Sequence, residues 1–277
     1  MAENNFSLQK TLTMLLDEKK YHSLRDILST MNPADIAAIF DDLDQACLPL
    51  LFRLLPKELA AETFVEMEPE AQELLIQGFS DSELKEVIDE LYVDDAVDIV
   101  EEMPANVVQR ILSQAEPDMR KQINEILRYP EDSAGSIMTT EYVSLRPNMT
   151  VEEAILRIRR TGIDKETIYT CYVTRGHKLI GLTSVKDLLL CEDDDATIES
   201  IMQEHVITVS TLDDKEQVAQ MFSKYNFLAL PVVDTEDRLV GIVTFDDAMD
   251  VMEDEATEDM EKMAAMLPSE HPYMRST

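Results

Sequence analysis

The segment IMTTEYVSLRPNMTVEEAILRI, which starts at Ile137, resembles the segment IMQEHVITVSTLDDKEQVAQMF, which starts at Ile201. Further along the chain, GLTSVKDLL at Gly181 resembles GIVTFDDAM at Gly241. Each copy combines short apolar strand patterns with amphipathic helical patterns. Self-similarity at a fixed period indicates a duplicated structural unit. We therefore predict two copies of a β-α-β-β-α module in the second half of the chain.

The first half of the chain follows a different pattern, because residues 5–128 are almost free of glycine. Prolines precede successive amphipathic segments, as expected at the first position of a helix: Pro33, Pro56, Pro69, Pro104 and Pro117. Ser80 and Glu83 have the spacing of a capping box, and another helix is predicted to open at Asp94. Short helices repeated in this way bury their apolar faces by stacking. We predict an all-α superhelix over residues 1–129.

The chain of 277 residues is acidic, with 24 Lys and Arg against 57 Asp and Glu and a net charge of −33. A hydrophobic fraction of 45% is typical of globular proteins. The charge argues against nucleic acid or an anionic membrane surface as a partner. Cations or basic protein surfaces fit better. For most single carboxylates, a solvated surface position is the simpler interpretation.

The cysteines and histidines are dispersed along the chain, and neither set has the spacing of a metal site. The three cysteines, Cys47, Cys171 and Cys191, suit a reducing cytoplasm. No signal peptide opens the sequence and no apolar run reaches the length of a membrane span, so we expect a soluble chain. Nucleophile elbows and glycine-rich phosphate loops are absent from the sequence. We therefore predict that the chain is not an enzyme and has no catalytic residue.

The segment DDAMDVMEDEATEDME, Asp246 to Glu261, contains nine carboxylates and has the pattern of a helix. Acidic residues form one stripe: Asp247, Asp250, Asp254, Glu258 and Glu261. An opposing stripe is apolar: Met249, Met252, Ala256, Met260 and Met263. Each pair of like charges one turn apart costs about 0.2–0.5 kcal/mol. The stripe therefore indicates a positively charged counterpart.

Two short motifs connect the duplicated modules to a known family. Gly181 precedes Ser184-x-x-Asp187 and Gly241 precedes Thr244-x-x-Asp247, a pattern that resembles tandem CBS domains. Together with the acidic helical region before them and the acidic segment after them, the chain resembles the cytosolic region of an MgtE-family magnesium channel or transporter. The resemblance implies an α plus α/β fold with CBS modules at 130–200 and 201–250 and an acidic connecting helix at 251–277.

The resemblance also implies a function. Members of that family bind Mg²⁺ between the superhelix and the CBS modules, which keeps the assembly compact and the pore shut, and loss of Mg²⁺ loosens it. We expect a homodimer on the cytoplasmic face of the cell membrane, joined to a transmembrane pore domain that is missing from this chain. A free-standing adenine-nucleotide sensor that regulates another protein is the alternative.

The resemblance assigns Mg²⁺ ligands to acidic positions of the superhelix, the second CBS module and the connecting helix. They are Asp94, Asp98, Glu216, Asp247, Asp250, Glu255, Glu258 and Asp259. Asp95 is a weaker candidate on a different helix face. Asn226 stands where the family has an acidic residue in the site that joins Glu216 to Asp250, so this site is expected to be weaker or absent.

The CBS pattern further implies an ATP cleft in which a carboxylate contacts the ribose and a hydroxyl lies near phosphate. The residues assigned to this cleft are Tyr169, Ser184, Lys186, Asp187, Phe227 and Pro231. A purely structural role, in which Ser184 and Thr244 cap helices, explains the same motif equally well.

Overall fold

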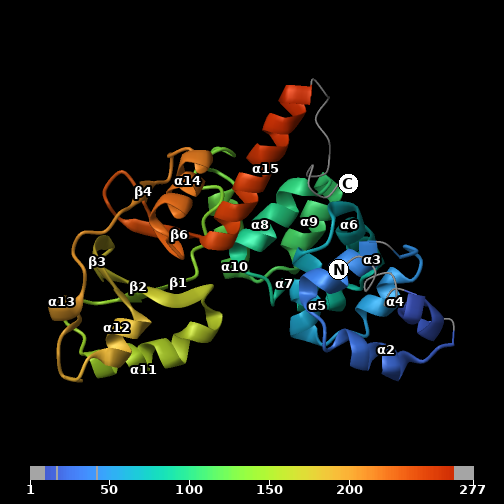
Figure 1. Cartoon of the computed structure of the whole chain (residues 1–277), viewed down its shortest axis with the longest axis horizontal. Helices are drawn as coiled ribbons and strands as arrows, with labels where there is room; N and C mark the ends of the chain where they lie inside the picture. Colours follow the sequence, from blue (N-terminus) through green and yellow to red (C-terminus); the bar gives the residue numbers. More distant parts are fainter. Residues whose placement is uncertain (1–9, 17, 42, 265–277) are drawn as a thin grey trace. The chain divides into compact units, whose positions relative to one another are not determined.

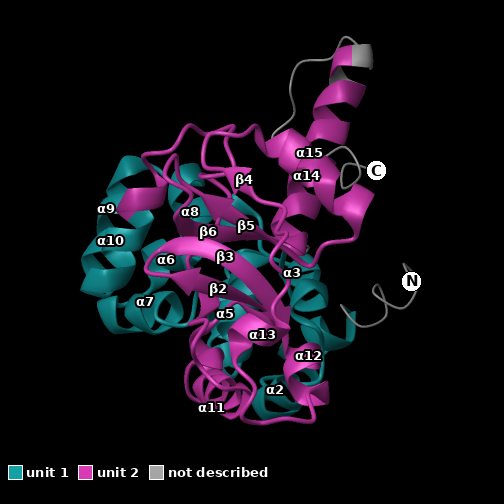
Figure 2. Cartoon of the chain, turned by 90° about the vertical axis from the view of Figure 1, so that its left-hand side faces the viewer, with its two compact units in different colours: residues 1–123 teal, residues 124–277 magenta. Residues whose placement is uncertain are grey.

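This computed structural model describes residues 10–16, 18–41 and 43–264 of the chain (Figure 1). The chain divides into two compact units, residues 1–123 and 124–277 (Figure 2). In the part that the structure describes, no helix is both long and apolar enough to cross a membrane.

The first unit consists of short helices. They are α2 (Tyr21–Leu28), α3 (Pro33–Asp41), α4 (Leu48–Phe52), α5 (Lys57–Val65), α6 (Pro69–Gly78), α7 (Asp81–Ile88), α8 (Val93–Glu102), α9 (Ala105–Gln114) and α10 (Pro117–Ile126), the last of which runs across the boundary between the units. Alternate helices pack on one another, α3 on α5, α5 on α7 and α7 on α9. This stacking buries the apolar face of each helix and confirms the predicted helical repeat.

The helix starts follow the local sequence closely. Ser80 caps α7, because its hydroxyl accepts the Glu83 N–H at 3.3 Å while the Glu83 carboxylate accepts the Ser80 N–H at 2.8 Å. Arg53 donates to the same carboxylate at 2.7 Å, and this contact together with the Ser80 donors lowers the pKa of Glu83 to about 2. The predicted capping box is confirmed.

Three of the five prolines occupy the predicted first helical position, and two do not. Pro56 and Pro104 lie one residue earlier, as the N-caps of α5 and α9, with extended ψ angles of 152° and 145°. The fixed φ of proline suits both positions, so sequence alone does not separate them. Similarly, α8 begins at Val93, one residue before the predicted Asp94.

The second unit contains the two predicted modules. The first comprises β1 (Tyr142–Leu145), α11 (Val151–Thr161), the 3₁₀ turn η1 (Gly162–Asp164), β2 (Thr167–Arg175), β3 (Lys178–Ser184) and α12 (Val185–Leu190). After α13 (Ile198–Ile201), the second comprises β4 (Val209–Ser210), α14 (Lys215–Tyr225), β5 (Ala229–Val233), β6 (Leu239–Thr244) and α15 (Phe245–Ala264). The β-α-β-β-α order is confirmed in both copies.

Both sheets have the same topology. The first strand pairs in parallel with the second, and the second pairs antiparallel with the third, in the orders β1-β2-β3 and β4-β5-β6. A parallel pair requires a crossover connection, which α11 and α14 supply. A shared apolar cluster that includes Tyr172, Ala229 and Ile242 joins the two modules.

Each module also receives a segment from outside its own repeat. The Thr139 N–H donates to the Ile242 carbonyl at 2.8 Å, so the segment of the first module that precedes β1 pairs with β6 of the second module. Leu182 of β3 pairs in the same way with Gln203, which belongs to the second module and precedes β4. The two modules are therefore interlocked and form one unit.

Candidate functional site

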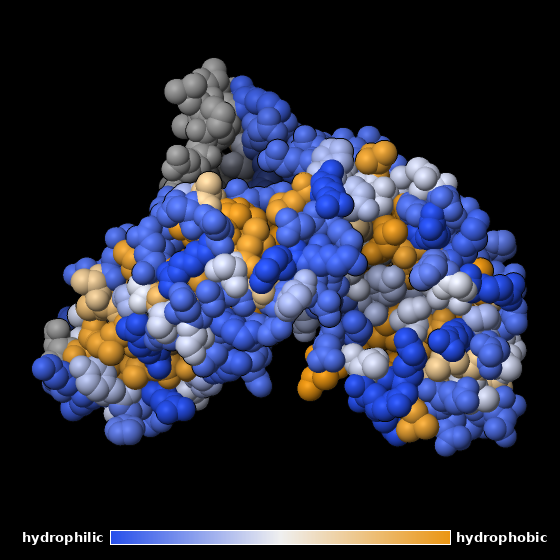
Figure 3. Space-filling model, turned by 180° about the vertical axis from the view of Figure 1, so that it is seen from behind, coloured by the Kyte–Doolittle hydropathy of each residue, from blue (hydrophilic) through white to orange (hydrophobic). Residues whose placement is uncertain are grey.

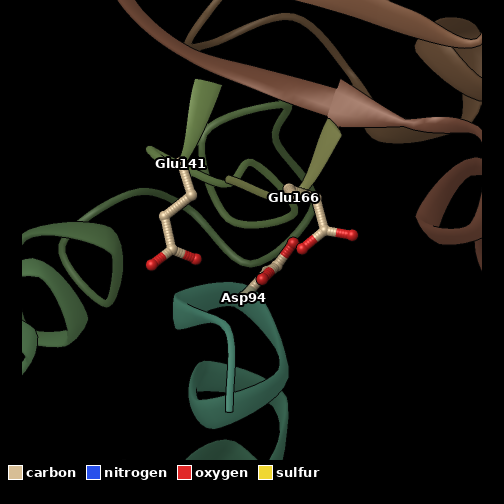
Figure 4. A group of neighbouring side chains, drawn as sticks. All are labelled: Asp94, Glu141 and Glu166. Carbon is tan, nitrogen blue, oxygen red and sulfur yellow. The ribbon is translucent and has the colours of Figure 1, made fainter. Parts of the chain in front are cut away.

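The predicted superhelix ligands lie on α8. Asp94, drawn in Figure 4, is in the first turn of this helix. Its side chain is buried, whereas Asp98, one turn later, is exposed. Asp95 is half-buried. The apolar residues of α8, Val97 and Val100 among them, are buried and fix the helix in the stack. The predicted one-turn spacing of Asp94 and Asp98 is present, and their role as metal ligands stays a prediction.

Two further carboxylates meet in the first CBS module, and the sequence analysis missed them. Glu141 precedes β1 and Glu166 precedes β2, and Figure 4 shows both at the starts of these strands. The Glu166 N–H donates to the Glu141 carbonyl at 2.9 Å, and an oxygen of each carboxylate lies within 4.8 Å of the other. Parallel pairing brings the two strand starts together. The predicted β-α-β order already implied this parallel pairing, and it was the signal in the sequence that could have brought the two residues together.

The methionine stripe of α15 indicated a buried face, but a different face of the helix packs on the core. Ala248 and Val251 are buried in the core of the second module. Met249, Met252 and Met260 are 47%, 37% and 42% exposed, so most of the methionine stripe faces solvent. Ala248 and Val251 share this cluster with Val218, Ala219 and Phe222 of α14, the helix on which α15 packs.

The predicted ligands on α15 differ in exposure. Asp247 and Glu255 are half-buried, whereas Asp250, Glu258 and Asp259 are exposed. Glu258 pairs with Lys262 at 2.5 Å. The side chains of Glu261 and Met263, and the predicted continuation of this helix over 265–277, lie outside the described residues.

Glu255 on α15 meets Glu216 on α14. Burial raises the pKa of Glu255, and a hydrogen bond to the Glu216 carboxyl and the charges of Glu216 and Glu258 raise it further, against a weaker lowering by Lys262. A hydrogen bond between two carboxyl groups requires one shared proton. When both carboxyl groups are ionised they repel each other, and a proton or a metal ion bound between them would offset that repulsion.

Asn226 has a structural role at the end of α14. It adopts a left-handed conformation with φ 54° and ψ 44°, and its N–H donates to the Phe222 carbonyl at 2.8 Å. Asparagine is one of the few residues that take this conformation at low cost. This helix cap accounts for an amide at position 226.

The two Ser/Thr-x-x-Asp motifs both lie at helix starts. Ser184 Oγ donates to Asp187 at 2.6 Å and accepts the Asp187 N–H at 3.0 Å, which completes a capping box at α12. At the start of α15, the Thr244 N–H donates to the Asp247 carboxylate at 3.2 Å, and the Thr244 hydroxyl donates to the same oxygen. The capping role is thus confirmed for Ser184, and for Thr244 it stays a prediction.

Four of the six predicted nucleotide residues gather at one edge of the first sheet. Thr170 pairs with Ser184, so Tyr169, which is 68% exposed, lies beside the start of α12 with Lys186 and Asp187. The other two belong to the second module: Pro231 is buried in β5, and the Phe227 ring lies 6.4 Å from that of Phe222.

The chain thus combines a helical-repeat unit with an interlocked pair of β-α-β-β-α modules, and carboxylates lie on α8, α14 and α15. Residues 31–132 match the MgtE intracellular N domain, and residues 134–192 and 198–254 match the CBS domain. The chain belongs to the MgtE family, as its sequence predicted.

Two relatives that match most of the chain are named as magnesium transporters. The magnesium transporter MgtE of Thermus thermophilus is 39% identical over 264 residues, which are 94% of this chain and 58% of that protein. MgtE of Bacillus subtilis is 32% identical over 255 residues, 92% of this chain and 56% of that protein. The chain thus spans little more than half the length of these relatives.

Two solved structures share the whole fold. The cytosolic domain of the Mg²⁺ channel MgtE in complex with ATP superposes with a TM-score of 0.82 at 38% identity, covering 88% of this chain and 99% of that one. The soluble part of a magnesium transporter superposes with a TM-score of 0.81 at 33% identity, and the match covers 92% of this chain and 100% of that one. The predicted fold class is confirmed over both units.

Proposed function

We propose that this chain is the Mg²⁺-sensing regulatory region of a magnesium channel or transporter. It acts at the cytoplasmic face of the membrane, is compact when Mg²⁺ is bound, and loosens when Mg²⁺ is scarce. Membership of the MgtE family and the magnesium transporters among the relatives support this assignment. The transmembrane pore that it controls is the proposed partner domain.

The contact of Glu216 with Glu255 is the observation that carries the proposal. These carboxyl groups lie together on packed helices in a chain of net charge −33, and burial and mutual repulsion raise the pKa of Glu255. Mg²⁺ binds one or two carboxylates and keeps several waters, which suits such a pair. The proposed ligands are Asp94, Asp98, Glu216, Asp247, Asp250, Glu255, Glu258 and Asp259.

We further propose that the chain forms a homodimer through its CBS modules. Leu189 and Leu190 of α12 are 64% and 69% exposed, and Phe245 and Met249 of α15 are 46% and 47% exposed. Hydrophilic residues dominate the face shown in Figure 3, with apolar residues in separate patches. Exposed apolar residues on helices are suited to burial in such an interface.

ATP is the second proposed ligand. The solved relative in complex with ATP supports it, as does the grouping of Tyr169, Ser184, Lys186 and Asp187 at one sheet edge. The capping contacts involve one oxygen of Asp187, Oδ2, so its carboxylate has an oxygen available for a ribose hydroxyl. A free-standing nucleotide sensor remains the alternative function that this site would serve.

The Glu255→Gln variant tests the metal proposal, because it keeps the shape of the side chain and removes its charge. A raised pKa stabilises the folded chain below the unfolded value of about 4.3, and this contribution is lost as pH rises through the folded pKa. Without Mg²⁺, the variant should therefore gain thermal stability over wild type as pH rises from about 4 to 7.

In calorimetric titrations at pH 7, we expect Mg²⁺ to bind wild type with saturable heat and Glu255→Gln at least about fivefold more weakly, since one charged ligand is lost. Glu253→Gln, on the opposite face of α15, is the matched control and should titrate like wild type. Identical titrations of wild type and Glu255→Gln would remove this pair from the proposed site.

For ATP, Asp187→Asn keeps a capping oxygen and removes the charge, whereas Asp187→Ala also removes the cap. Both variants should lose ATP binding by about tenfold or more, and Asp187→Asn should retain the stability of wild type. Binding of ATP that is unchanged in both variants would show that Asp187 is not part of the nucleotide site.

A further inference from the structure

A group of arginines surrounds a hollow in the first CBS module, away from the carboxylates described above. The hollow has a volume of about 570 Å³ and is lined by Arg146, Asn148, Met149, Glu153, Leu156, Arg157 and Arg160. Such a volume lies in the range of small-molecule sites. Three arginines in one lining are notable in a chain with 57 acidic and 24 basic residues.

The local fold places these side chains on one face of α11. Glu153, Leu156, Arg157 and Arg160 follow the spacing i, i+3, i+4, i+7, which is one stripe of a helix. The other face of α11, with Val151, Ala154 and Ile158, is buried in the core of the module. The loop between β1 and α11 adds Arg146, Asn148 and Met149 to the same hollow.

These arginines have no carboxylate partner among the described residues. The ion pairs found among the described residues of the CBS modules use other basic residues, for example Arg175 with Glu199 and Arg238 with Asp234. Glu153 lies one turn before Arg157, but its carboxylate accepts the Thr150 N–H at 3.1 Å as part of a capping box. The lining therefore keeps an excess of positive charge.

We propose that this hollow binds a small phosphorylated molecule through Arg146, Arg157 and Arg160. A guanidinium presents donors in a planar fork that matches phosphate oxygens, and several forks around one hollow select a compact, multiply charged anion. Met149 and the half-exposed Leu156 offer apolar contacts to the remainder of the ligand. The net charge of −33 disfavours a long polyanion such as a nucleic acid at the same surface.

This site shares no residue with the proposed ATP site at the start of α12, which involves Tyr169, Ser184, Lys186 and Asp187. The two sites are therefore separable by mutation. A chain with both would respond to a phosphorylated metabolite as well as to Mg²⁺ and ATP.

The probe is inorganic pyrophosphate, titrated into the whole chain in metal-free buffer and followed by calorimetry and ³¹P NMR. We expect saturable binding with a dissociation constant of about 1 mM or tighter. Arg157→Gln and Arg160→Gln should each weaken it by about tenfold, as expected for loss of a charged hydrogen bond. Arg159→Gln, on the same helix but outside the lining, should change it less than about twofold.

Circular dichroism of each variant checks that it folds, which is expected because these arginines are not in the core. Asp187→Asn should leave pyrophosphate binding unchanged, and its loss in this variant would place the anion in the ATP site and overturn the proposal. Absence of saturable binding, or equal losses in Arg157→Gln and Arg159→Gln, would also overturn it. Self-association that depends on Arg157, with no pyrophosphate bound, would instead assign the arginines to an acidic segment of a second copy.

Discussion

Replacing Gly241 with alanine should lower the free energy of unfolding of the second unit by about 2–3 kcal/mol. A Cβ atom at this position would lie 2.6 Å from Met138 Sδ and 2.8 Å from the Thr139 carbonyl oxygen. The sulfur belongs to a flexible side chain and can move. The carbonyl cannot move freely, because it accepts the Ile242 N–H at 2.9 Å. The added methyl group therefore forces the segment that precedes β1 away from β6.

Urea unfolding measures the loss, and hydrogen exchange at the Thr139 and Ile242 amides shows whether it starts at this contact. Gly78→Ala is the matched control: no atom lies within 4 Å of its added Cβ, and it ends α6, so stability should hold or rise slightly. Gly181→Ala should behave like Gly241→Ala, since Gln203 and Met202 crowd it in the same way. Equal effects of Gly78→Ala and Gly241→Ala would contradict this account.

The duplicated modules were predictable because the two copies keep their pattern of strands and helices, although the distance from Ile137 to Gly181 is longer than that from Ile201 to Gly241. The interlocking was not, because Thr139 and Ile242 are distant in sequence and no local pattern pairs them. A hint was present: Met138 and Met202 occupy equivalent places in the two copies, and each packs against a glycine of the other repeat. Contacts of this kind become visible only when the repeats are arranged in space.

The candidate site was predictable in part. The helical spacing in the sequence correctly predicted that Asp94 and Asp98 lie one turn apart and that Asp247 lies at the start of a helix. The methionine pattern of α15 gave an apolar stripe, but hydrophobicity alone does not say which apolar residues face α14, and Ala248 and Val251 do. The approach of Glu216 to Glu255 depends on how α14 and α15 pack, which the sequence does not specify.

Addition of Mg²⁺ should produce the largest response of the protein. A ligand that binds only one state stabilises it by about 2.7 kcal/mol per site at a hundred times its dissociation constant. Several carboxylate sites that each prefer the compact state would together shift the population almost completely. Screening alone acts differently, because at equal ionic strength NaCl and MgCl₂ give the same Debye length. Ion-specific compaction therefore separates binding from screening.

Small-angle X-ray scattering of the chain in MgCl₂ and in NaCl of matched ionic strength tests the central claim most directly. The account predicts that the radius of gyration falls in millimolar Mg²⁺, and falls several-fold less in NaCl. It also predicts that the chain with Asp98→Asn, Asp247→Asn and Glu255→Gln combined loses most of the Mg²⁺ response. Equal contraction in the two salts, or an unchanged response in the triple variant, would contradict Mg²⁺ sensing by these carboxylates.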